Sequence, residues 1–292
     1  MQMRTRKSVR SLLEEEKPLI TPLAHDALSA RLIEKAGFKC IGIGGSPLLA
    51  ARYGLPDLGL AALGEMTAGI ADIVRATDLP VIVDADDGYG DTKNVAYTTD
   101  AYMRIGASGM TMEDQERARK QPGDSGSLGV VPTETMVRKL RAATTVRAGT
   151  DFHLVARCDA YAIEGMEGAL RRGDEYLKAG ADGIFITGVT RIEDLAAIGR
   201  HFHGAHTMTV MFEGRDTWLS PSRLYDLGFK QIVYPGVLLS RVVYAIDTAL
   251  ADLKAFADGR APMTQPPNGA RVQAALEAAV RLDRWQAVDG HT

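Results

Sequence analysis

Short apolar runs alternate with amphipathic stretches along most of the chain. The apolar runs are rich in β-branched residues and predict eight strands, at residues 19–23, 40–44, 81–85, 109–113, 153–157, 183–187, 207–212 and 231–234. Between them, apolar positions recur at helical spacing and predict helices at residues 25–36, 66–76, 95–105, 134–147, 166–179, 192–202 and 222–227. Several of these helices end in a glycine just before the next strand, as in EKAGFKCIGI and LKAGADGIFI, where a left-handed helix stop is expected. The pattern is that of repeated βα units.

The number of these units predicts the fold class. Near-continuously apolar strands belong to a parallel sheet that is covered by helices, and eight βα units are the number that closes a (β/α)₈ TIM barrel of the α/β class. A doubly wound open sheet is the alternative, but no glycine-rich GxGxxG motif follows the first strand. We therefore expect a closed barrel.

A helical extension follows the predicted barrel. Residues 237–256 form a long helical pattern, and the stretch DGRAPMTQPPNGA after it has the composition of a linker before a last helix near residues 271–285. This assigns residues 1–257 to the catalytic barrel and residues 258–292 to a linker and a C-terminal helix. Because no further barrel strand remains for that helix to cover, we expect it to pack on a neighbouring subunit of a homo-oligomer, a dimer or a tetramer.

Composition narrows the range of partners. The 292 residues are 46% hydrophobic and 24% charged, with a net charge of −3. The chain has no basic run of the kind that binds nucleic acid, no stretch long and apolar enough to span a membrane, and no signal-peptide pattern near its start. We expect a soluble cytoplasmic protein. The two cysteines, Cys40 and Cys158, lie in apolar runs and are expected to be buried thiols.

The string VDADDGYG, residues 83–90, is the strongest chemical signal. Its strand ends in acids, and alternation would place Asp84 and Asp86 on the same face. Carboxylates that crowd together repel one another unless a cation or protons neutralise them, and ligand sets made only of oxygen favour Mg²⁺ or Mn²⁺. A divalent metal site is one interpretation, and a solvated turn whose acids cap the next helix is the other.

Other strand ends favour the metal site. In a TIM barrel the carboxyl ends of all strands meet at one mouth, where active sites lie. Polar residues there include the Gly44-Gly45-Ser46 turn, Glu113 and Arg157. Each has a structural explanation by itself, such as a helix cap or an ion pair. Together, acids, an arginine and exposed amides predict a site for a small carboxylate bound to a metal ion.

Once these residues are aligned, the chain resembles the isocitrate lyase and phosphoenolpyruvate mutase superfamily, which includes 2-methylisocitrate lyases, carboxyphosphonoenolpyruvate mutases and an oxaloacetate decarboxylase-like branch. The motifs GGS, YGLPDLG, DADDGYG, MEDQ, VARCDA, FEG and YPG carry this resemblance in order. It implies a (β/α)₈ barrel, a Mg²⁺ cofactor and a C-terminal helix that is swapped between subunits. It also implies roles for individual residues: Asp84, Asp86, Asp57 and Glu113 for the metal and its water shell, and Gly44, Gly45, Ser46, Arg157 and Glu213 for the substrate.

One motif of the lyase members is missing. Their loop after strand four carries a KKCGH or KRCGH motif with a cysteine acid or base, whereas this chain reads EDQERARKQPGDSGSLGVVPTE. Asp124 stands near the motif's histidine and is our candidate catalytic replacement, with Lys120 and Arg119 as further polar groups of the same loop. Decarboxylation needs only an electron sink, so the sequence predicts a lyase that acts on a small 2-oxo or 2-hydroxy dicarboxylate through an enolate and resembles an oxaloacetate decarboxylase. A mutase or hydrolase for P–C bonds is the first alternative, and an inert metal-binding barrel is the second.

Overall fold

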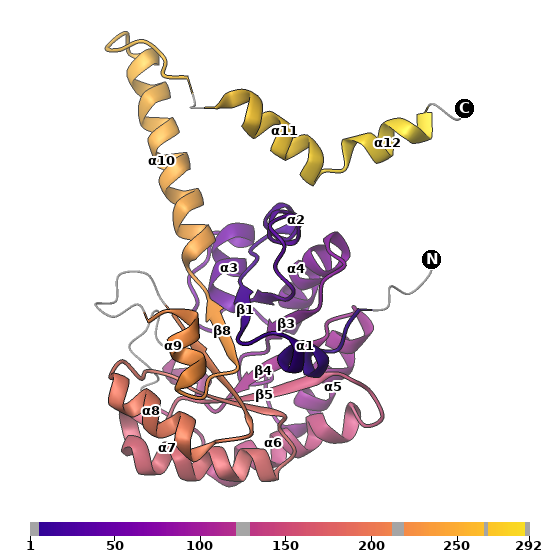
Figure 1. Cartoon of the computed structure of the whole chain (residues 1–292), viewed down its shortest axis with the longest axis vertical. Coiled ribbons are helices and arrows are strands. Elements are labelled where there is room, and N and C mark those ends of the chain that lie inside the picture. The colour runs from indigo at the N-terminus through magenta and orange to yellow at the C-terminus, as the bar shows by residue number, and fades with distance from the viewer. Residues whose placement is uncertain (1–5, 121–128, 212–218, 266–267, 290–292) are drawn as a thin grey trace.

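The computed structural model describes residues 6–120, 129–211, 219–265 and 268–289. Its centre is a barrel of eight parallel strands (Figure 1). The strands are β1 (Leu19–Pro22), β2 (Ile41–Ile43), β3 (Val81–Asp84), β4 (Gly109–Glu113), β5 (His153–Cys158), β6 (Gly183–Ile186), β7 (His206–Val210) and β8 (Gln231–Tyr234). Strand β8 pairs with β1, and a parallel bridge between Leu23 and Gly42 joins β1 to β2 and closes the barrel. The predicted (β/α)₈ fold is confirmed.

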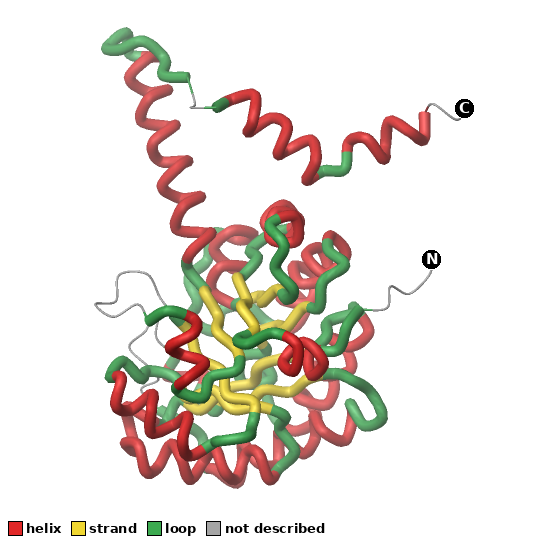
Figure 2. The backbone as a smooth tube through the Cα atoms, in the orientation of Figure 1, coloured by secondary structure: helices red, strands yellow, loops and turns green. Residues whose placement is uncertain are grey.

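Helices surround the barrel (Figure 2). They are α2 (Ala27–Lys35), α4 (Leu63–Ala76), α5 (Thr92–Arg104), α6 (Thr133–Val146), α7 (Tyr161–Lys178), α8 (Ile192–His201) and α9 (Pro221–Asp226). Two helices were not predicted, α1 (Val9–Glu15) and α3 (Gly45–Tyr53). Val9 and Leu12 of α1 are fully buried against Leu19, Cys40 and Ile82, so α1 covers the end of the barrel where the strands begin.

Apolar side chains occupy both faces of the strands. The larger core lies between the strands and the helices, where Met110, Met112 and Leu154 are fully buried. A smaller group, the inner cluster, consists of Leu23, Val155, Phe185, Met208 and Val233. Its members come from five different strands or strand ends, and it forms the apolar middle of the barrel interior.

The C-terminal part differs in detail from the prediction. Helix α10 (Val237–Ala257) has no buried residue and extends away from the barrel (Figure 1). The last helix is in fact two helices, α11 (Gly269–Ala279) and α12 (Leu282–Asp289), because Arg281 takes a left-handed φ of 55° that no α-helix can contain. The end of α11 contacts α2, where Arg31 donates to the carbonyl of Ala279 at 3.1 Å. Within the described residues, no helix is both long and apolar enough to cross a membrane.

A buried histidine pair lies among the first residues of the strands. His153 Nε2 is 2.9 Å from His206 Nδ1, and both rings are almost fully buried. Burial lowers the pKa of His153 to about 4 and takes that of His206 well below its usual value. Both rings therefore stay neutral in the folded protein at pH values where the unfolded chain takes up protons.

We expect the free energy of unfolding to fall as the pH drops from about 6.5 towards 4, because the unfolded state then binds more protons than the folded one. His153 alone contributes a loss of about 2 kcal/mol between pH 7 and pH 5. Urea denaturation at the two pH values should show His153→Gln losing less stability than the parent chain. His201→Gln is the surface control and should keep the parent's loss; an equal loss in all three proteins would contradict this account.

Candidate active site

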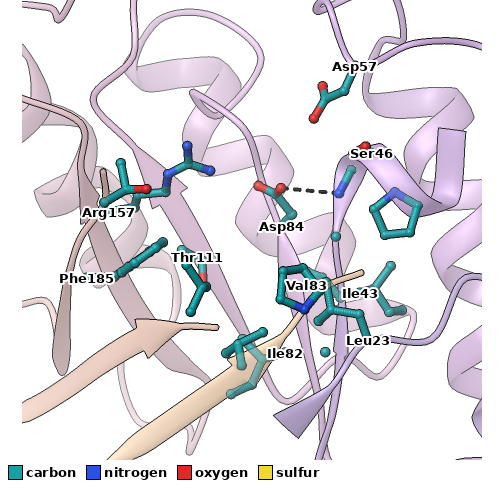
Figure 3. A pocket seen from close by; sticks show the side chains of 18 of the residues that line it. Leu23, Ile43, Ser46, Asp57, Ile82, Val83, Asp84, Thr111, Arg157 and Phe185 are labelled. Atoms are coloured by element: carbon teal, nitrogen blue, oxygen red, sulfur yellow. Dashed lines mark hydrogen bonds between the residues drawn. The ribbon is translucent and has the colours of Figure 1, made fainter. Parts of the chain in front are cut away.

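The end of β3 fixes the first two acids. Asp86 follows the strand in a left-handed conformation, with a φ of 45°, so simple strand alternation does not describe its position. The amide of Asp86 donates to Asp84 Oδ1 at 3.0 Å, and the amide of Gly45 donates to Asp84 Oδ2 at 3.2 Å (Figure 3). The Asp84 carboxylate is therefore oriented by two backbone amides, one on each oxygen.

The Gly-Gly-Ser segment begins a helix and is not the turn that we expected. Gly44 is the N-cap of α3, and Gly45 is its first residue. A Cβ atom on Gly45 would lie 3.5 Å from Asp84 Oδ2 and 3.6 Å from Asp57 Oδ2, so the helix backbone comes close to both acids. Because the N-terminus of a helix carries a partial positive charge, the start of α3 is a place that attracts negative charge.

Three of the four predicted metal acids contact one ammonium group, and the fourth, Asp84, lies beside Asp86. Lys120 Nζ lies 3.0 Å from Asp57 Oδ1 and 3.5 Å from Glu113 Oε1, and it also forms an ion pair with Asp86. The Lys120 side chain is only 7% exposed. Burial opposes its charge, but Glu113 and Asp86, followed by Asp84 and Asp57, outweigh burial and raise the pKa of Lys120. The structure therefore brings Asp57, Asp86 and Glu113 to one cationic group, and their role as metal acids stays a prediction.

These acids fit a cation that keeps part of its water shell. No three Asp, Glu, His or Cys side chains in the described ranges are grouped closely enough to enclose a bare metal ion. The Lys120 ammonium nevertheless attracts oxygens from β4, the β3 turn and the loop that carries Asp57, as a hydrated dication would. Burial and the neighbouring Asp84 raise the pKa of Asp86, and the Lys120 ammonium acts against that shift.

Arg157 lies beside the cluster at the end of β5. Its Nη1 is 3.0 Å from Glu113 Oε2, and its Nη2 donates to Asp159 Oδ1 at 2.8 Å. Burial raises the pKa of Glu113 to about 8, although Arg157 and Lys120 act against that shift. The Arg157 side chain remains 24% exposed, so its guanidinium is fixed by two acids and still faces the cavity. Asp114, next in sequence to Glu113, points away to Tyr176 and Arg172.

A cavity of about 410 Å³ opens at this mouth (Figure 3). Among the predicted site residues, those that line it are Gly44, Gly45, Ser46, Asp57, Asp84 and Arg157. Asp86 and Glu113 contact Lys120, which also lines the cavity. Asp124 and Glu213 lie outside the described residues. Chemically, the mouth offers carboxylates for a cation on one side and a fixed guanidinium for an anion on the other.

Comparison with known proteins identifies the family of the chain. The family model described as phosphoenolpyruvate phosphomutase matches residues 9–254. The chain belongs to this family. It lies within the superfamily that also contains the isocitrate lyases, as the resemblance predicted.

Relatives within the superfamily include carbon–carbon lyases. The chain is 36% identical to a 2,3-dimethylmalate lyase of Eubacterium barkeri over 252 residues, which cover 86% of this chain and 85% of the relative. It is 34% identical to a 2-methylisocitrate lyase of Halalkalibacterium halodurans over 226 residues, 77% of this chain and 74% of the relative. A crystal structure of oxaloacetate acetylhydrolase superposes with a TM-score of 0.83 at 27% identity and covers 96% of this chain and 97% of that one. The chain is therefore an enzyme of the carbon–carbon lyase class in this superfamily.

Two features of the site go beyond the sequence prediction. Asp159 accepts hydrogen bonds from Arg157 and from Gln115 Nε2, the latter at 3.1 Å, and so helps to hold the arginine. The motif VARCDA contains Asp159, but strand alternation alone does not show its partner. Lys120 was recognised only as a polar residue of the loop, because its contacts with three acids depend on how residues 117–120 fold back over the mouth.

Replacing Lys120 with Met should leave Asp57, Asp86 and Glu113 without their shared ammonium. In the absence of divalent cations we expect a loss of about 3 kcal/mol in the free energy of unfolding. Added Mg²⁺ should then raise the melting temperature more in K120M than in the parent, because the ammonium no longer competes for the acids. Lys93→Met, on the exposed surface of α5, is the matched control. Equal Mg²⁺-induced shifts in K120M and the parent would rule out a shared cation position.

Proposed function

We propose that the chain is a Mg²⁺-dependent lyase that cleaves a bond next to the carbonyl of a small 2-oxo or 2-hydroxy dicarboxylate through an enolate, with oxaloacetate decarboxylation as the reaction to test first. The observation that carries the proposal is the convergence of Asp57, Asp86 and Glu113, from three separate segments, on one cation position beside Arg157. Asp84 lies next to Asp86 at the end of the same strand. Mn²⁺ has the same preference for oxygen ligands and is an alternative ion.

Acidic residues of the site would bind the metal, and the arginine and the hydrogen-bond donors would bind the substrate. Asp84 and Asp86, with Asp57 and Glu113 farther out, would hold the metal, which supplies a Lewis acid for the oxygen where negative charge develops. Arg157, fixed by Glu113 and Asp159, binds a substrate carboxylate and orients the bond to be broken. Ser46 and the first amides of α3 lie on the other side of the cavity, where they can donate to a second substrate oxygen.

Loss of CO₂ from oxaloacetate does not require the loop cysteine that this chain lacks. The departing group leaves as a neutral molecule and needs no proton, and the enolate that remains can be protonated afterwards. Asp124 remains our candidate for that proton transfer. Cleavage of a P–C bond is the second candidate, favoured by the family model and by a crystal structure of a phosphoenolpyruvate phosphomutase from Streptomyces platensis subsp. rosaceus, which superposes with a TM-score of 0.82 at 25% identity.

Turnover should depend on Asp84 and Arg157. Asp84→Asn removes the charge that attracts the metal, and Arg157→Lys removes the bidentate hydrogen bonding of a guanidinium to a carboxylate. We therefore expect each substitution to lower kcat/KM for oxaloacetate by at least about 100-fold. Calorimetry should show that Asp84→Asn also loses Mg²⁺ affinity while Arg157→Lys keeps it.

Asp100→Asn, on the surface of α5, is the control for these variants and should behave as the parent does. The substrate panel should contain oxaloacetate, 2-methylisocitrate, alkylmalates and phosphonopyruvate. Full activity of Asp84→Asn would overturn the metal assignment. If the parent binds Mg²⁺ but turns over no compound of the panel, the barrel is an inert binding protein.

The C-terminal helices support the proposal of a homo-oligomer. Helices α10 to α12 expose many large apolar side chains, including Tyr244, Leu253, Leu276 and Trp285. Exposed apolar faces of this extent are typical of surfaces covered by another protein chain. We propose that α11 and α12 pack on a neighbouring subunit of a dimer or tetramer, beyond the limited contact that α11 makes with its own α2.

Charged substitutions on this face should weaken assembly. We expect Leu276→Glu to lower the molar mass measured by light scattering at micromolar protein concentration, because a carboxylate cannot be buried there without a partner. Gln273→Glu places the same charge on the same helix at a polar position and should keep the parent's mass. An unchanged mass in Leu276→Glu would show that this face of α11 is free in solution.

A further inference from the structure

The cavity at the mouth continues deep into the barrel. TIM barrels usually fill their interior with layers of side chains and are not hollow. Here one continuous cavity is lined both by Asp84 and Arg157 at the mouth and, deeper in the barrel, by Gln231, the first residue of β8, and its partner Thr21 on β1. Its volume of about 410 Å³ equals roughly fourteen water molecules at about 30 Å³ each. That is more room than a four-carbon dicarboxylate needs.

One wall of this cavity is a single row of register partners. Arg157 pairs with Phe185 on β6, Phe185 with Met208 on β7, and Met208 with Gln231 on β8. Arg157 lies near the end of its strand and Gln231 is the first residue of its own, so the row runs from the mouth to the floor. With strands about 4.8 Å apart and tilted by about 36°, three steps descend roughly 8 Å. The two residues between the ends of the row are apolar.

Much of the remaining lining is also apolar. Leu23, Ile82, Val210 and Val233 line the same space, and Figure 3 shows Leu23 and Ile82 on the barrel side of Asp84. Leu23 and Val233 keep 9% and 8% exposure inside the barrel, whereas Met110 and Met112 on the outer face of β4 have none. This remaining exposure shows that these two side chains of the inner cluster border the cavity.

The floor is polar but uncharged. Gln231 Nε2 donates to Thr21 Oγ1 at 2.9 Å, and both residues are almost fully buried. Between this pair and the plane of Asp84 and Arg157, no lining residue in the described ranges is charged. A second carboxylate would lose its hydration there without gaining a partner, whereas a hydrocarbon chain would lose nothing.

We propose that this inner channel binds an apolar arm of the substrate, several carbons long, while the metal acids and Arg157 hold the polar 2-oxo or 2-hydroxy acid head at the mouth. The inference rests on the proposed function for the position of the head. It names a substrate class, 2-oxo or 2-hydroxy acids with an alkyl arm on the carbon next to the reacting bond, and it assigns Phe185, Met208 and Val233 to the recognition of that arm.

Binding of alkylated enolate mimics tests the channel without requiring turnover. N-alkyl oxamates, from methyl to pentyl, carry an oxalate-like head and an arm of graded length. Calorimetry in the presence of Mg²⁺ should show the affinity rising by about three- to four-fold for each methylene until the arm reaches the Thr21–Gln231 pair. An affinity that stays flat or falls as the arm lengthens would overturn the proposal. This test uses only the parent protein and does not depend on whether a variant folds.

Two substitutions at Val233 should shift the preferred arm length in opposite directions. Val233→Phe fills the channel, so the ratio of the pentyl to the methyl oxamate affinity should fall at least ten-fold below the parent's ratio. Val233→Ala lengthens the space and should move the optimum to a longer arm. Parent-like ratios in both folded variants would also overturn the proposal.

Turnover separates this inference from the proposed function. We expect kcat/KM for oxaloacetates with alkyl groups on carbon 3 to follow the oxamate series. If oxaloacetate is decarboxylated but longer arms bind no better, the channel proposal fails and the lyase proposal stands. If the oxamate series rises but no oxo acid or malate is turned over, the channel stands and the lyase proposal fails.

Discussion

The mouth of the barrel depends on the neutralisation of crowded negative charge. Asp57, Glu113 and the pair Asp84 and Asp86 come from three segments of the chain, and a closed parallel barrel brings them to one place. At the low effective dielectric of a partly buried site, several carboxylates at such distances cannot all stay ionised unless positive charge lies among them. Lys120, Arg157 and the N-terminus of α3 supply that charge. The same demand for positive charge is what makes the site suitable for a divalent cation and for an enolate bound to it.

The barrel interior is organised by polarity along its axis. Charged groups lie at the mouth, the inner cluster lies in the middle, and Thr21, Gln231 and the histidine pair lie near the floor, which α1 covers. The neutral His153–His206 pair keeps charge away from the floor at neutral pH. Electrostatic interactions at the mouth therefore act above an apolar region that contains no competing charge, which strengthens them.

The sequence predicted the repeating architecture well, because strand and helix periodicities are local properties. All eight strands lie where the apolar runs placed them, within one or two residues, and β4 and β8 have the predicted bounds. The prediction missed α3, because Gly44-Gly45-Ser46 has the composition of a turn and a helix start there depends on close approach to Asp84. It treated the C-terminal pattern as one helix, since nothing in the sequence shows that Arg281 adopts a left-handed conformation. The convergence of the acids followed from the fold, whereas the position of Lys120 depends on tertiary contacts that no local pattern contains.

A crystal structure with Mg²⁺ and oxalate, a mimic of the enolate, tests the central claim most directly. The account predicts one Mg²⁺ ion between Asp84 and Asp86, with Asp57 and Glu113 reaching it through water, oxalate bound to the ion and facing Arg157, and the Lys120 ammonium displaced from the acids. The opposite result would be Lys120 still in contact with Asp57, Asp86 and Glu113 and oxalate held by Arg157 alone, with no metal ion at the mouth under saturating Mg²⁺. That result would contradict the claim that these acids exist to hold a dication.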